Sequence, residues 1–102
     1  MNNVEMNIAK QAILDKLEAR IKTAEAKLDT LKARAETAKA NIEIKAITEL
    51  LITKRTILQK LQDLKKSGGS PWEQAKADLE ARIADFEKAV KGIELMAKAK
   101  AS

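Results

Sequence analysis

The strong helix-breaking residues are concentrated in one short stretch of this chain, and this constrains the fold more than any other feature. The stretch Ser67-Gly68-Gly69-Ser70-Pro71 holds two of the three glycines and the only proline. Its final serine and proline, with Glu73 three residues after the serine, are typical of a helix start: an N-cap, a proline in the first turn and a capping-box acid. The sequence therefore predicts helices over residues 3–66 and 71–98, joined by a turn at residues 67–70 in one domain of 102 residues.

Apolar residues predict how these helices pack. From Leu14 they recur in alternating steps of three and four, which is the spacing of a coiled-coil seam. Around Ile42 two steps of four follow each other, and a second apolar stripe widens the face over residues 42–64. A wide face needs two partner helices, and residues 71–98 supply one through the stripe from Trp72 to Ile93. The residues expected at the dimer or bundle interface are Leu14, Leu17, Ile21, Leu28, Leu31, Ala35, Ala38, Ile42, Ile47, Leu50, Leu51, Ile57, Leu58 and Leu61.

Two arrangements supply the second partner, and both are all-α. In the first, the helix over residues 3–66 stays whole and a second copy crosses it antiparallel, with the two-fold axis near Ala35 and a three-helix bundle at each end. In the second, the helix breaks near Asn41 and one chain closes as a monomeric three-helix bundle. Residues 33–40 have strong helix propensity and Asn41 alone is a weak breaker, so the sequence favours the antiparallel dimer.

The composition excludes most site chemistry. The chain has no cysteine, histidine or tyrosine, which excludes thiolate and imidazole metal sites, disulfides and His-based catalysis. It also has no calcium-loop pattern and no glycine-rich phosphate loop. We therefore expect no catalytic, cofactor-binding or metal-binding residues, no cofactor, and no enzymatic activity.

The charged residues indicate a solvent-exposed helical surface. The net charge of +5, from 20 basic and 15 acidic residues, is spread along the chain, which disfavours a nucleic-acid partner. No apolar run reaches the length of a membrane span and no signal segment is evident, so a cytoplasmic location is expected. Acids placed four residues before bases predict pairs within helices: Glu18 with Lys22, Asp78 with Arg82, Glu87 with Lys91 and Glu94 with Lys98.

Residues 64–73, Leu64-Lys65-Lys66-Ser67-Gly68-Gly69-Ser70-Pro71-Trp72-Glu73, resemble a group of small bacterial coiled-coil proteins of unassigned function. Their pattern is a long charged helix, a Ser-Gly turn and a short amphipathic helix that opens with Trp-Glu. Where those proteins often have a second tryptophan, eleven residues after the first, this chain has Ile83. The resemblance implies a helical coiled-coil fold and no activity.

These observations predict a non-enzymatic structural or protein-interaction protein, working as a rod-like homodimer with an unidentified protein partner. The alternative is a peripheral binder of lipid or hydrophobic surfaces, which would lay the wide apolar face over residues 42–64 on a membrane. In both readings Gly68, Gly69, Ser70 and Pro71 form the turn, Glu73 caps the second helix, and Trp72 packs beside the turn.

Overall fold

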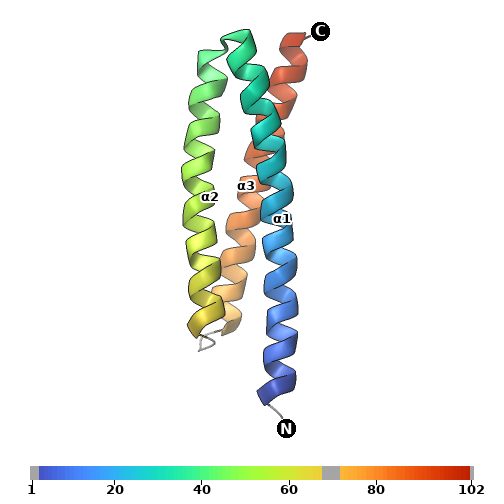
Figure 1. Cartoon of the computed structure of the whole chain (residues 1–102), viewed down its shortest axis with the longest axis vertical. Coiled ribbons are helices and arrows are strands. Elements are labelled where there is room, and N and C mark those ends of the chain that lie inside the picture. The colour runs from blue at the N-terminus through green and yellow to red at the C-terminus, as the bar shows by residue number, and fades with distance from the viewer. Residues whose placement is uncertain (1–2, 68–71, 102) are drawn as a thin grey trace.

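The computed structural model of the chain describes residues 3–67 and 72–101, and these form three helices and no strand. The helices are α1 (Asn3–Ala38), α2 (Asn41–Ser67) and α3 (Trp72–Ala101), which pack side by side in a rod of 57 × 19 × 17 Å (Figure 1). α1 and α3 run in the same direction, and α2 runs antiparallel to both. The expected all-α fold is thus confirmed for this part of the chain. The predicted turn residues 68–71 lie outside the described residues, while Trp72 and Glu73 open α3 as expected.

The prediction of a single helix over residues 3–66 is wrong, because α1 ends at Ala38 and a second helix begins at Asn41. Lys39 takes a left-handed conformation with φ of 55°. Its amide N–H donates to the Glu36 carbonyl at 3.2 Å, and the Ala40 N–H donates to the Ala35 carbonyl at 2.9 Å. This pair of bonds is a Schellman motif, which satisfies carbonyls at the end of a helix. The break is where the alternative arrangement placed it, near Asn41.

The apolar stripe does not run straight across the break. The buried stripe of α1 ends at Ala35, and the next buried apolar residue along the chain is Ile47. Twelve residues at about 100° each would leave these two side chains about 120° apart on an unbroken helix. Turning the chain allows both stripes to face one core. Ala38 and Ile42, which were expected to bridge the stripes at an interface, are exposed instead, Ile42 by 74%.

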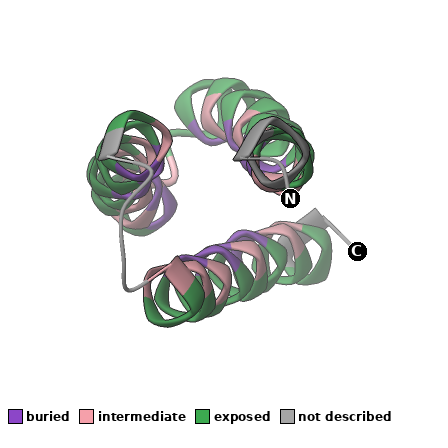
Figure 2. Cartoon of the chain, turned by 90° about the horizontal axis from the view of Figure 1, so that it is seen from below, coloured by how far each residue is buried: buried purple, intermediate pink, exposed green. Residues whose placement is uncertain are grey.

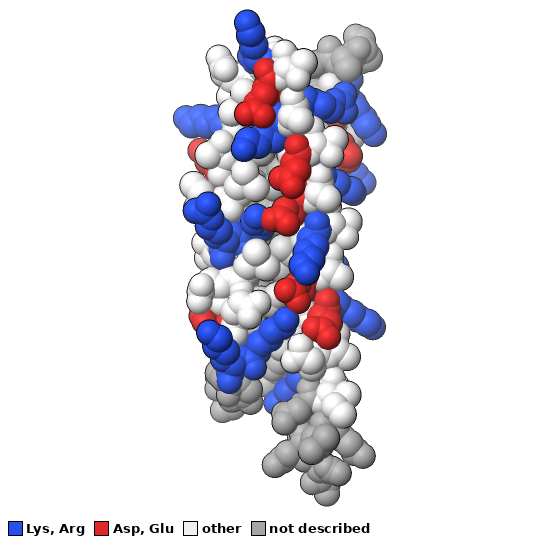
Figure 3. Space-filling model, viewed as in Figure 1, with Lys and Arg blue, Asp and Glu red and all other residues white. Residues whose placement is uncertain are grey.

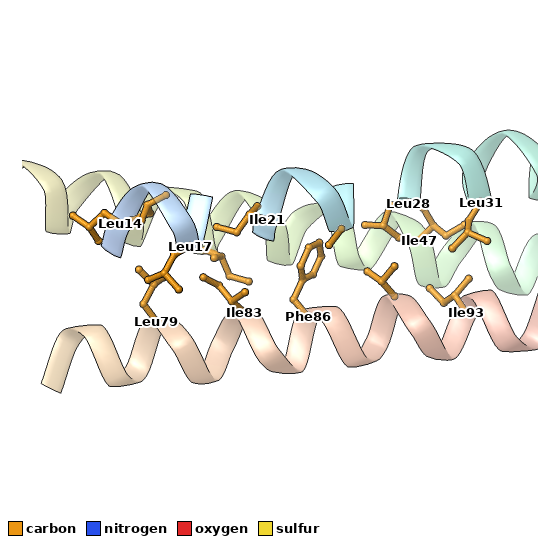
Figure 4. Close-up of a cluster of buried hydrophobic side chains, with 14 of the residues drawn as sticks. Leu14, Leu17, Ile21, Leu28, Leu31, Ile47, Leu79, Ile83, Phe86 and Ile93 are labelled. Carbon is orange, nitrogen blue, oxygen red and sulfur yellow. The ribbon is translucent and has the colours of Figure 1, made fainter. Parts of the chain in front are cut away.

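The core lies along the axis between the three helices, where their buried faces meet (Figure 2). Side chains from α1 and α3 interdigitate in successive layers, among them Leu17 and Leu79 at one level and Leu31 and Ile93 at another (Figure 4). Burying one large apolar side chain contributes about 1.5–3 kcal/mol, so a few such residues outweigh the roughly 1–2 kcal/mol cost of a left-handed Lys39. The chain's own α1 therefore covers the strip of α2 that a second copy was expected to cover.

Glycine at position 39 should stabilise the fold. Lys39→Gly removes the steric cost of the left-handed conformation, and we expect the free energy of unfolding to rise by about 1 kcal/mol. Chemical denaturation followed by circular dichroism measures the change. The control is Ala33→Gly at an exposed site inside α1, where glycine should lower stability by about 1 kcal/mol. Equal destabilisation by both changes would contradict the assigned turn.

Candidate interaction surface

The seam between α1 and α2 is closed by charges of opposite sign. Glu25 of α1 pairs with Lys54 of α2, and Lys65 Nζ lies 2.9 Å from Glu18 Oε1 and 3.9 Å from Asp15 Oδ1. A column of acidic side chains runs along α1 in Figure 3. The side chains of Lys54 and Lys65 are only 18% and 19% exposed, so their methylene stems also cover the core. The flank of α1 that faces α2 is therefore acidic and the opposing flank is basic.

The seam between α1 and α3 is closed by an ion pair in which α1 supplies the base and α3 supplies the acid. Arg20 of α1 holds Glu87 of α3 through two bonds, Nη2 to Oε1 at 2.5 Å and Nε to Oε2 at 3.1 Å. The guanidinium lowers the pKa of Glu87, chiefly through these hydrogen bonds and against the effect of desolvation, and Lys27 lowers it further. Arg20 and Lys27 are one heptad apart, as are Glu80 and Glu87, and Glu80 also acts on Arg20. Such spacing is typical of charges that flank a coiled-coil core.

Trp72 anchors the start of α3. Its side chain is half-buried and packs against the core cluster. Lys10 Nζ of α1 lies 5.0 Å from the centroid of its ring, which is the geometry of a cation–π contact. The first turn of α3 is thereby joined to α1, although the two are more than sixty residues apart in sequence.

The middle of the seam between α2 and α3 has no such closure. Between residues 50–57 and 82–86 the structure describes no ion pair from one helix to the other, and Arg82 Nε instead donates to Asp78 Oδ2 of its own helix at 2.9 Å. A hollow of about 420 Å³ lies here, with the buried Ile57 and Phe86 at its floor. Ile52, 59% exposed, stands at its rim. This open hollow combines apolar side chains with the polar Thr53, Thr56, Arg82 and Asp85.

The exposed apolar side chains are also concentrated on these two helices. Among the described residues the exposed large ones are Ile8, Ile42, Ile52, Leu95 and Met96, and only the first belongs to α1. Scattered exposed apolar residues are ordinary, whereas one placed beside an apolar hollow marks a candidate contact surface. We call the hollow, with Ile52, Arg82 and Asp85 at its rim, the α2–α3 patch.

The residues expected at interfaces fall into three groups. Buried in the core are Leu14, Leu17, Ile21, Leu28, Leu31, Ala35, Ile47, Ile57 and Leu61. Leu50, Leu51 and Leu58 are partly buried against it, and Ala38 and Ile42 are exposed. Of the pairs expected within helices, Asp78 with Arg82 is confirmed, whereas Glu18 and Glu87 bind Lys65 and Arg20 of other helices.

Sequence reasoning did not single out two features. Glu43 is a buried acid, 5% exposed, in the first turn of α2, beside a hollow of about 180 Å³ that Arg34 also lines. The contact of Arg20 with Glu87 was also missed, and the heptad spacing from Arg20 to Lys27 and from Glu80 to Glu87 is the signal that could have indicated it.

Comparison with known proteins gives no relative: no family model, curated protein or solved structure matches the chain. Within the described residues no group of three or more acidic, histidine or cysteine side chains is placed to hold a metal ion. None of the helices, over the same residues, combines the length and apolarity needed to cross a membrane.

The ion pair between Arg20 and Glu87 should give stability a specific pH dependence. Because the folded-state pKa of Glu87 is lowered, the pair stabilises the fold above the ordinary value of 4.5, and this is lost as the pH falls through the folded-state pKa. Glu87→Gln should lower the free energy of unfolding at neutral pH by at most about 1 kcal/mol, since both side chains are over a third exposed and solvent screens the pair.

The measurement is urea denaturation of both proteins from neutral to acidic pH. The difference in the free energy of unfolding between wild type and Glu87→Gln should become smaller below about pH 4.5. The control is Glu49→Gln at an exposed site of α2, which should follow the wild-type profile. A difference in the free energy of unfolding that stays constant down to the lowest pH would show that the pair does not act as described.

Proposed function

We propose that this protein is a non-enzymatic structural or protein-interaction module that works through the outer surface of its helical rod. The observation that supports the proposal is how the side chains are distributed. The apolar stripes of the three helices are buried in one core, and ion pairs join α1 to α2 and to α3. What remains available to another molecule is the outside of the rod, above all the α2–α3 patch.

The proposal keeps the expected homodimer, now as two bundles that are each closed within one chain, whereas the break after Ala38 agrees with the alternative arrangement, a monomeric three-helix bundle. In the expected dimer a second copy completed the core, but α1 now fills that position within one chain. Two copies must then associate through exposed residues. Each bundle keeps its own core, because that contact does not involve the buried side chains. A face of 57 by 19 Å is large enough to bury the roughly 800 Å² per partner of a standard interface.

Lipid binding is the competing function, and it makes opposite demands on the fold. The apolar face over residues 42–64 is largely turned into the core, with Ile47, Ile57 and Leu61 fully buried. A membrane could reach these side chains only after α2 separates from α1 and α3, which would break the ion pairs of Lys54 and Lys65. An intact bundle is therefore expected beside vesicles.

Light scattering and small-angle X-ray scattering on one sample test the dimer. We expect a mass of about 22 kDa, twice the 11.2 kDa of the chain, and high helicity in plain buffer. Trp72 emission should keep its wavelength when anionic vesicles are added. A blue shift of Trp72 emission together with vesicle-bound protein would contradict the proposal and favour the lipid-binding function.

A further inference from the structure

We draw no further inference here: the strongest candidate, the outward face of α1, where small exposed residues alternate in steps of four and three from Ala19 to Thr37, carries none because nothing in the structure shows what covers it.

Discussion

The offset between the apolar stripes of α1 and α2 is the constraint on which the rest of the structure depends. On an unbroken helix Ile47 would lie about 120° from Ala35, so the apolar stripe would not run straight past Lys39. Reversing the chain there removes the conflict and makes α2 the antiparallel partner of α1. Once these two helices lie together, their joint groove is the place for the stripe of α3, whose largest fully buried side chain is Phe86.

Regular spacing was predictable and the turn was not. The three-and-four rhythm from Leu14 to Ala35 and the glycine-rich stretch before α3 are periodic or compositional signals, and both are read from neighbouring residues. The turn at Lys39 uses residue types that also suit a helix, and the one local signal for it, Asn41, is weak, so the choice between a turn and a continuous helix depends on tertiary burial. The same holds for the α2–α3 patch, because Ile52 and Phe86 are brought near one hollow only by the packing of the two helices.

The charged residues bear on two properties that the apolar seams do not determine, the register of the helices and the side of α1 on which each neighbour packs. Leucines and isoleucines at heptad spacing would also pack after a slip of one heptad, and they do not specify on which side of α1 each neighbour lies. The acidic flank of α1 meets Lys54 and Lys65, while Arg20 on the other flank meets Glu87. Each contact is weak because it is partly solvated, but exchanging α2 and α3 would set like charges against each other on both sides. The charge pattern therefore favours this handedness of the bundle over its mirror arrangement.

The odd number of helices determines how this rod can be built into something larger. α1 starts at one pole, and α3 ends near the other (Figure 1). A hairpin or four-helix bundle would return both ends to a single pole, and any two domains attached to it would be neighbours. Here two attached domains would instead be separated by a strut about 57 Å long, and tension between them would act along the helix axes. Domains attached to the two ends of such a rod would be held apart, whereas an even-numbered bundle would hold them together.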